Sequence, residues 1–267
     1  TKEALDFIRR NKSNNFFLYL SFTIPHANNE LGRAKGNGME VPSDEPYSDR
    51  PWPQPQKNHA AMITRLDDSV GKILNLLDEL GIDENTLIFF SSDNGPHKEG
   101  GADPEFFKSA GPFKGYKRSL YEGGIRVPFI IRWKNKVEAG KKCSVPVAFW
   151  DILPTFAELA GITPPSDIDG VSFAPLLLGN EKVIAQKFYN KPLYWEFYEG
   201  GFQQAMRLGE WKVILKKYGE PLELYNIIED PSEEKNLANE YLDKVKELNE
   251  IMKSQRKPAP YWQTPLD

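Results

Sequence analysis

The stretch Leu87-Ile88-Phe89-Phe90-Ser91-Ser92-Asp93-Asn94-Gly95 decides the fold class. It opens with an unbroken apolar run, which is typical of a strand buried on both faces, and it closes with turn residues. Ahead of it, apolar residues within 58–80 recur at steps of three and four, and Gly81 follows, which predicts a helix that ends there. An aromatic-rich run, residues 16–22, precedes the helix and predicts another buried strand. The order strand, helix, strand predicts a crossover unit with parallel strands.

Similar patterns predict the elements around this unit. Residues 1–10 predict the end of a helix, whereas residues 27–57 show no period, are rich in Pro, Gly, Asn and Asp, and predict a long functional loop. The apolar run 127–131 predicts a third strand. Residues 149–161 predict a helix, with Asp151 placed to cap its first turn. Together these elements indicate an α/β fold whose sheet is flanked by helices.

Beyond residue 180, short strands replace this pattern. A polar helix near residues 240–254 follows them. We predict a smaller antiparallel sheet with a terminal helix packed on it. The chain is therefore expected to form two domains, residues 1–180 and residues 181–267. The short strands expected in the second domain are residues 193–198, 204–208 and 210–216.

The composition excludes several classes of function. The chain has 267 residues, with 34 Lys and Arg against 38 Asp and Glu and a formal net charge of −4. Because nucleic-acid binding needs clustered cations and none are clustered here, nucleic acid is not expected as a partner. The apolar runs are far shorter than the roughly 20 residues that cross a bilayer, so no membrane span is expected. The single cysteine, Cys143, excludes an internal disulfide and a thiolate metal site.

Polar side chains follow two of the predicted strands. His26 comes after the run 16–22, and Asp93 and Asn94 come after the run 87–90. The carboxyl ends of parallel strands meet at one edge of a sheet, where ligands collect, so we expect these side chains to share that edge. Carboxylate and amide oxygens are the ligands that Ca²⁺ and Mg²⁺ prefer. The sequence therefore predicts a site for a hard divalent cation.

Each of these residues also has a simpler interpretation. Asp93-Asn94-Gly95 is typical of a tight turn, and His26 taken alone is typical of a loop histidine held by a backbone carbonyl. His59 and His97 are interpreted as structural or solvated. The segment 111–128 carries four cations and four glycines, and it is either a solvated loop or a loop whose lysine binds an oxyanion.

Taken together, these segments resemble the sulfatases of the alkaline phosphatase superfamily. The resemblance rests on their order and spacing, which make the match specific. It continues into the C-terminal part and covers essentially the whole chain. The segments that carry it are residues 16–26, 66–71, Ser92-Asp93-Asn94-Gly95-Pro96-His97 and 117–128, followed by 151–155, 169–172, 193–196 and 223–226.

The resemblance implies an alkaline-phosphatase-like fold, with a mixed or parallel sheet flanked by helices, of which this chain holds part. It also implies hydrolysis of a sulfate monoester by a formylglycine, made from Cys or Ser in a C-x-P-x-R type motif, beside a bound Ca²⁺ rather than Mg²⁺. Asp93 and Asn94 correspond to two of the metal ligands. Lys117 corresponds to the lysine that binds the sulfate, and His26 to the histidine that contacts and protonates the leaving oxygen.

One part of the family pattern is missing. Cys143 lies in Lys141-Lys142-Cys143-Ser144-Val145, which lacks the Pro and Arg of the formylglycine motif, and no other Cys or Ser fits that motif. The paired Asp metal ligands of the family are missing too, and the chain opens at Thr1 without a Met or a signal peptide. We therefore interpret the chain as the C-terminal portion of a sulfatase, inactive without the N-terminal part as its partner.

Two other functions remain open at this point. A phosphonate or phosphodiester hydrolase of the same superfamily shares the metal carboxylate and the fold. A noncatalytic homologue would bind sulfated glycans without hydrolysing them. The substrate expected from the resemblance is a sulfated small molecule or glycan, and kinship suggests a periplasmic or secreted location because many relatives are exported.

Overall fold

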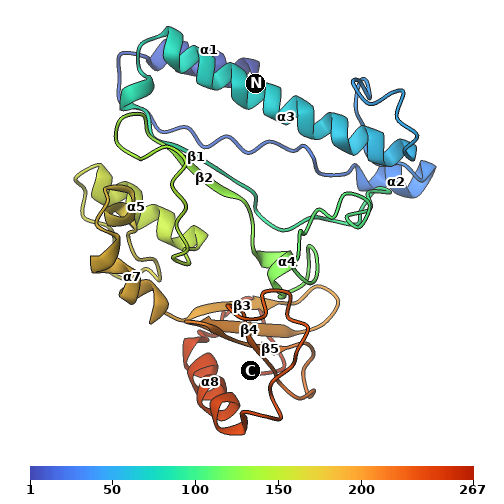
Figure 1. The fold of residues 1–267 in the computed structure, drawn as a ribbon, viewed down its shortest axis with the longest axis vertical. Helices are drawn as coiled ribbons and strands as arrows, with labels where there is room; N and C mark the ends of the chain where they lie inside the picture. The colour runs from blue at the N-terminus through green and yellow to red at the C-terminus, as the bar shows by residue number, and fades with distance from the viewer. The chain divides into compact units, whose positions relative to one another are not determined.

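The computed structural model describes the backbone of residues 1–267 and the side chains of all but residues 181–183. The chain forms two compact units (Figure 1). The predicted domain boundary at residue 180 falls inside the second unit and stays a prediction. The first unit is Thr1–Gly111 with Val127–Asn135, and the second is Pro112–Arg126 with Lys136–Asp267.

Helices α1 and α3 form the helical layer of the first unit (Figure 1). Their shared core contains Ile8, Leu76 and Leu77, which are almost fully buried. The predicted helices are confirmed. Helix α3 begins earlier than the spacing predicts because Pro55 is accommodated in its first turn, where a missing N–H costs nothing. The helices of this unit are α1 (Lys2–Asn11), α2 (Asn29–Lys35), α3 (Gln54–Glu79) and the 3-10 turn η1 (Asp83–Asn85).

Two of the predicted strands pair in the first unit. Strand β1 (Ile88–Ser91) pairs with β2 (Phe129–Arg132) in antiparallel register, with Phe89 opposite Ile131. The rings of Phe89 and Phe129 meet edge to face at 5.4 Å between centroids. Among the residues that the structure describes, the named strands pair only with antiparallel neighbours. The predicted parallel pairing is therefore wrong for this structure.

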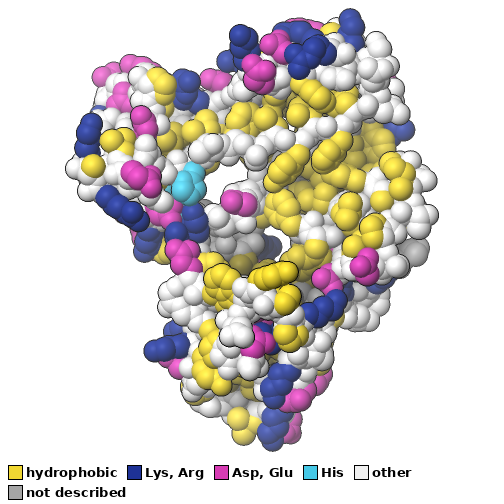
Figure 2. Space-filling model, turned by 180° about the vertical axis from the view of Figure 1, so that it is seen from behind, with side chains coloured by type: hydrophobic (Ala, Val, Ile, Leu, Met, Phe, Trp, Pro, Cys, Tyr) yellow, Lys and Arg dark blue, Asp and Glu magenta, His cyan; other side chains and the backbone are white. Residues whose placement is uncertain are grey.

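The predicted buried strand over residues 16–22 is wrong as well. The segment runs extended beside α3 (Figure 1) without forming a ladder, and Phe17 and Tyr19 are 69% and 74% exposed. Phe16 and Leu18 pack against the helical core instead. Because alternate residues of an extended chain face opposite sides, the helices cover one face of this aromatic run and leave the other exposed. Figure 2 shows hydrophobic side chains gathered on one face of the molecule.

The second unit contains the predicted small antiparallel sheet, with helix α8 (Leu242–Gln255) on one face (Figure 1). Leu248 and Met252 of the helix form a buried cluster with Met206, Val213 and Leu224 of the sheet. Gly209 makes the turn between β4 and β5 at a φ of 60°. This part of the prediction is confirmed, although β6 was not expected. The strand order is β3 (Leu193–Phe197), β4 (Gln203–Leu208), β5 (Trp211–Leu215) and β6 (Glu223–Asn226).

The opposite face of this sheet holds the glycine-rich segment 112–126. Ala205, Ile214 and Tyr225 project to that face, one position away from the residues that face α8, as the two-residue period of a strand requires. They form a core with Leu120, which leads into the short helix α4 (Glu122–Ile125). The sheet therefore supports the loop that carries Lys117.

Asp151 does not cap the helix that follows it. Its carboxylate accepts the N–H groups of Ala148 at 2.9 Å and Val171 at 2.8 Å, and it pairs with Lys191 at 2.6 Å. A fully buried carboxylate needs such partners, and these hold it away from the first turn of α5. The predicted helix 149–161 is otherwise present. The helices here are η2 (Phe149–Asp151), α5 (Ile152–Leu159), α6 (Ala174–Leu177) and α7 (Glu181–Tyr189).

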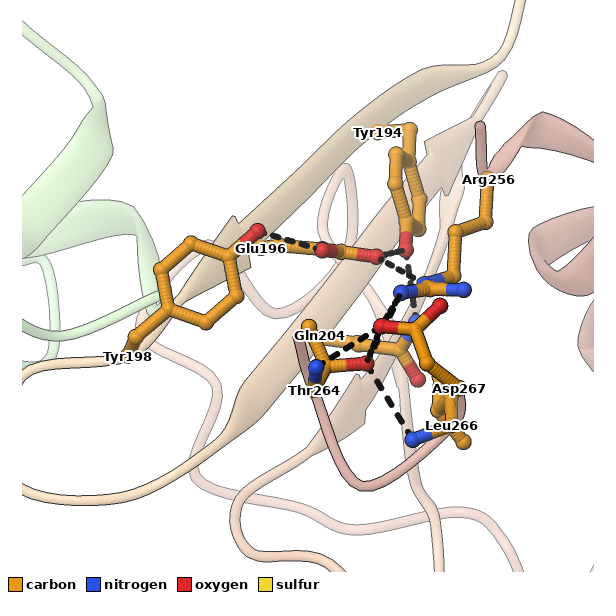
Figure 3. A network of polar contacts seen from close by, with 8 residues as sticks. All are labelled: Tyr194, Glu196, Tyr198, Gln204, Arg256, Thr264, Leu266 and Asp267. Atoms are coloured by element: carbon orange, nitrogen blue, oxygen red, sulfur yellow. Dashed lines mark hydrogen bonds and ion pairs between the residues drawn. The ribbon is translucent and has the colours of Figure 1, made fainter. Parts of the chain in front are cut away.

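A polar network secures the residues after α8 to the sheet (Figure 3). Arg256 donates to Glu196 at 3.0 Å and to Asp267 at 2.8 Å. Glu196 also accepts the hydroxyl of Tyr198 at 2.6 Å, and it lies opposite Gln204 in the β3–β4 register. In the part of the chain that the structure describes, none of the helices combines the length and the apolar character of a membrane span.

Candidate active site

The three histidines of the chain gather in the first unit. The ring of His97 lies between the other two, with centroid distances of 5.8 Å to His26 and 5.7 Å to His59. His26 lies in the turn after the extended segment 16–22, His97 in the loop after β1, and His59 near the start of α3. Three segments that are distant in the sequence therefore meet at this cluster.

His97 connects the loop after β1 to the turn that carries His26. Its Nδ1 accepts the N–H of Glu99 at 3.1 Å, and its Nε2 lies 3.2 Å from the carbonyl oxygen of Pro25. A carbonyl oxygen only accepts hydrogen bonds, so these partners assign a proton to Nε2. Because His97 is buried, with 7% of its surface exposed, both bonds are shielded from water.

His26 is oriented by a backbone carbonyl and a carboxylate. Its Nδ1 lies 2.8 Å from the carbonyl oxygen of Ala27, which places a proton on Nδ1. Its Nε2 lies 3.4 Å from Glu99 Oε2. The side chain of His26 is 44% exposed, whereas that of Glu99 is 14% exposed. Nε2 is therefore the nitrogen that can exchange a proton with a bound molecule.

His59 has a different environment. Only 6% of it is exposed, and burial, together with the neighbouring His97, lowers its pKa to about 4. Among the described residues its Nδ1 has no hydrogen-bond partner. The ring packs against Phe107 at 6.5 Å between centroids. His59 is therefore a neutral, buried side chain at neutral pH.

Asp93 and Asn94 directly follow β1. The Ser91 hydroxyl donates to the carbonyl of Pro128 at 2.9 Å and secures the end of the strand. Asn94 donates its amide N–H to the carbonyl of Gly95 at 2.8 Å, which leaves its amide oxygen as an acceptor. Asp93 is exposed. The pair thus offers two hard oxygen donors on a short turn. The turn conformation is compatible with metal binding, so the two interpretations of Asp93-Asn94-Gly95 do not exclude each other.

These two oxygen donors fit the preference of Ca²⁺, which takes about six to eight oxygens. Across the described residues, no group of three or more His, Cys, Asp and Glu side chains is arranged to hold a metal ion. Asp93 and Asn94 would therefore supply part of a coordination shell. Their loop continues into His97, whose bond to Pro25 joins it to the His26 turn.

Lys117 belongs to the second unit. It lies at the tip of a turn in which the N–H of Ser119 donates to the carbonyl of Tyr116 at 2.9 Å. The following residue, Arg118, has a φ of 75°, a left-handed conformation that is uncommon outside glycine. The structure thus joins the turn of His26 to the loop of Asp93 and Asn94 in the first unit. Lys117, the fourth predicted site residue, lies on a tight turn in the second unit.

Glu99 was not among the predicted site residues. It lies in a loop without hydrophobic period, and an acidic residue in such a loop is usually solvated. Its only sequence signal is its place two residues after His97, and that spacing has no meaning until the fold brings His26 beside it.

Comparisons with known proteins find sulfatases. The sulfatase family model matches residues 1–162, and the model described as N-sulphoglucosamine sulphohydrolase, C-terminal, matches residues 113–258. N-acetylgalactosamine-6-sulfatase of Canis lupus familiaris is 34% identical over 223 residues, covering 79% of this chain and 36% of the relative. Steryl-sulfatase of Homo sapiens is 39% identical over 196 residues, covering 70% of this chain and 30% of the relative.

Solved structures are similar to this chain in fold as well as in sequence. Ps i-CgsB, solved in complex with k-i-k-neocarrahexaose, superposes with a TM-score of 0.77 at 29% identity, over 95% of this chain and 53% of that chain. PsFucS1 sulfatase from Pseudoalteromonas sp. gives a TM-score of 0.69 at 25% identity, over 95% and 51%. The chain spans about a third of the length of the curated relatives and about half that of the solved structures.

The fold and these neighbours define an α/β protein of the alkaline-phosphatase-like class, as the sequence predicts. The family models and the curated relatives then narrow the class. This chain belongs to the sulfatase family.

Proposed function

We propose that this chain carries part of the active site of a formylglycine-dependent sulfatase that hydrolyses a sulfate monoester. One observation carries the proposal: His97 bonds to Pro25 and to Glu99, so the turn of His26 and the loop of Asp93 and Asn94 form one assembly. Membership of the sulfatase family supports the reaction class. The roles of the individual residues follow from their chemistry.

His26 is the general acid of this proposal. As the S–O bond breaks, negative charge grows on the leaving oxygen, and a proton delivered there lowers the barrier. The carbonyl of Ala27 holds the proton on Nδ1, so Nε2 is the atom that donates to the leaving oxygen. The carboxylate of Glu99 lies 3.4 Å from Nε2 and favours the orientation of the charged ring.

Lys117 binds the sulfate in this proposal. Its ammonium is a compact positive charge that faces several oxygens without a fixed geometry, which suits a tetrahedral oxyanion. Charge placed where the transition state gains negative charge stabilises it more than the ground state. Its position at the tip of a tight turn suits a lysine that reaches toward a ligand.

Asp93 and Asn94 would hold the divalent cation, for which we propose Ca²⁺ rather than Mg²⁺. When bound, the cation supplies positive charge beside the sulfate oxygens. The nucleophile is proposed to be a formylglycine from outside these 267 residues, because no Cys or Ser here lies in a C-x-P-x-R pattern. The remaining part of the catalytic domain is thus the partner of this chain.

A sulfated sugar is the substrate class that we propose. One structural relative, at a TM-score of 0.59 and 27% identity over 76% of this chain and 40% of that chain, was solved in complex with its substrate D-glucosamine-2-N,6-O-disulfate. We also propose a periplasmic or secreted location, where polymeric sulfated glycans are accessible. Neither proposal affects the roles of the four site residues.

The test is sulfate release by the complete natural protein from an aryl sulfate and from sulfated monosaccharides. His26→Asn, Lys117→Met and Asp93→Asn should each lower kcat/KM by about 100-fold or more. The controls are Lys246→Met and Asp243→Asn, whose side chains on α8 are 78% and 102% exposed, and both should retain full activity.

Three results would contradict the proposal. Faster turnover of an aryl phosphonate than of the aryl sulfate would indicate the phosphonate hydrolase. Affinity for sulfated glycans without hydrolysis would indicate the noncatalytic homologue. Full activity of the His26 and Lys117 variants would show that the site lies elsewhere.

A further inference from the structure

The turn that carries Lys117 rests directly on the two glycines of α4. A Cβ on Gly124 would lie 2.5 Å from the carbonyl oxygen of Tyr116 and 2.1 Å from that of Ser119, the residues that begin and end the turn. A Cβ on Gly123 would lie 2.2 Å from the carbonyl oxygen of Gly115. No side chain fits at these distances, so the turn packs directly against the backbone of α4.

Helix α4 is in turn fixed by a buried ionic cluster. The ammonium of Lys212 lies 2.9 Å from a carboxylate oxygen of Glu122 and 2.9 Å from one of Glu233. These three side chains are 0%, 4% and 0% exposed, in that order. Arg126 lies 3.6 Å from the second oxygen of Glu122 and balances the second negative charge. Lys212 belongs to β5 and faces the same side of the sheet as Ile214.

Glu233 contacts both ends of the loop. Its Oε2 accepts the backbone N–H of Glu122 at 2.6 Å, at the start of α4. Its main-chain carbonyl accepts a hydrogen bond from Lys114 at 3.0 Å, at the start of the loop. Its backbone has a φ of 55°, a strained conformation for a residue with a side chain. The surrounding fold therefore keeps Glu233 in this position at an energetic cost.

We infer that Glu233 is a positioning residue for Lys117, through which the C-terminal sheet sets the height and direction of the sulfate-binding turn. The inference rests on the proposed function of Lys117. Glu233 touches no substrate in this account. It holds Lys114 before the turn 116–119 and Glu122 after it, and the turn itself packs against Gly124.

A conservative substitution interferes with this arrangement in a defined way. Glu233 faces two donor groups. Its Oε1 lies 2.9 Å from the ammonium of Lys212 in an ion pair, and its Oε2 accepts the N–H of Glu122. The amide of Glu233→Gln has one oxygen and one NH₂ group, so its NH₂ group must face either the ammonium of Lys212 or the N–H of Glu122, and both of these are donors. Glu234 is the matched control, because it is the adjacent residue, has the same side chain and is exposed.

The experiment is a double-mutant cycle in the complete natural protein, with kcat, KM and inhibition by inorganic sulfate as readouts. Glu233→Gln should lower kcat/KM for the sulfate ester by about 10- to 100-fold and weaken sulfate inhibition, whereas Glu234→Gln should change neither. In a Lys117→Met background, Glu233→Gln should lower kcat/KM no further, because the group that it positions has gone. Purely structural damage would multiply the two losses.

The outcomes separate this inference from the function on which it rests. Full activity of Lys117→Met contradicts the proposed function. A Lys117→Met loss combined with an unchanged Glu233→Gln, or with losses that multiply in the double variant, overturns the inference alone. If Glu233→Gln does not fold, Lys114→Met is used in the same cycle, because it removes the hydrogen bond to the Glu233 carbonyl together with the contacts of the ammonium to Tyr121 and Tyr225.

Discussion

The imidazole of His97 bonds to the residue before His26: its Nε2 lies 3.2 Å from the carbonyl oxygen of Pro25. Its other nitrogen accepts the N–H of Glu99, the residue whose carboxylate pairs with His26. One buried ring therefore holds both the backbone and the partner of the proposed acid. The two bonds can be removed separately, because Asn and Gln amides each reproduce one imidazole nitrogen.

We expect His97→Asn to impair catalysis more than His97→Gln. The Asn amide oxygen can replace Nδ1 as the acceptor for Glu99, but the bond to Pro25 is lost. The Gln amide N–H can replace Nε2 as the donor to Pro25. Loss of the Pro25 bond frees the His26 turn, so kcat should fall about 10- to 100-fold in His97→Asn and less in His97→Gln. Steady-state kinetics on a sulfate ester measures both, and equal losses would contradict this role for the Pro25 bond.

His59 should make the protein acid-sensitive. Burial and His97 lower its folded pKa from 6.5 to about 4, so between these values the unfolded chain binds the additional proton. Stability is therefore full above about pH 6.5 and is lost as the pH falls toward about 4. Each pKa unit corresponds to about 1.4 kcal/mol, which sets an upper limit of roughly 3 kcal/mol for this effect.

His59→Leu tests this expectation. The variant removes the titrating ring and a buried Nδ1 that has no partner among the described residues. Its Tm should equal or exceed that of the unmodified protein near pH 7, because an unsatisfied polar atom is gone. The Tm difference in favour of the variant should then widen as the pH falls from about 6.5 to about 4. A difference that is constant over this range would show that His59 is not the group responsible.

Local patterns predict much of this fold because local physics determines it. The spacing of three and four residues in 58–80 predicts α3, and Gly81 ends it at a φ of 67°. A run of short strand-like segments separated by turns predicts the C-terminal sheet. Strand β6 was missed because it is only four residues long and begins and ends with polar side chains. The prediction of a buried strand over 16–22 is wrong because odd and even positions of this run are both mostly apolar. The sequence therefore does not show that only one face of the segment is covered.

The contacts that orient the candidate site could not be predicted in the same way. The bond between His97 and Pro25 joins residues 72 positions apart, and no local pattern encodes such a contact. Glu233 precedes Glu234 in an acidic pair that predicts a solvated surface, yet Glu233 is fully buried. The sequence identified residues whose chemistry suits sulfate ester hydrolysis, whereas the fold shows which neighbours hold them in place.

Asp83 should stabilise the first unit down to acidic pH. Its side chain is 3% exposed and pairs with Arg132 of β2 and, at 3.2 Å, with Lys134. The hydrogen bond from Arg132 is the main reason that the pKa of Asp83 is lowered to about 2. Because this folded pKa lies below the unfolded value of 3.8, the stabilisation is complete above about pH 4 and is lost as the pH falls toward about 2.

Asp83→Asn should therefore lower the Tm by about 3–6 °C near neutral pH. The gap to the unmodified protein should close as the pH falls from about 4 to about 2, where the native carboxylate is protonated as well. Asp78→Asn is the control, because Asp78 also lies 3.2 Å from Lys134 but is 71% exposed. Exposed ion pairs contribute little, so this variant should keep the Tm within about 1 °C. A similar loss in both variants would contradict a special role for the buried pair.

Removal of the proposed divalent cation gives the last prediction. Treatment of the complete natural protein with a chelator should abolish sulfate ester hydrolysis, and Ca²⁺ should restore it at lower concentration than Mg²⁺, since a flexible set of oxygen donors suits the larger ion. Asp93→Asn should weaken Ca²⁺ binding about 100-fold in calorimetry, because it replaces a charged ligand by a neutral one. Asp243→Asn, which removes a charge from a fully exposed side chain on α8, should bind Ca²⁺ normally. Unchanged Ca²⁺ affinity in Asp93→Asn would show that the turn after β1 contributes no ligand.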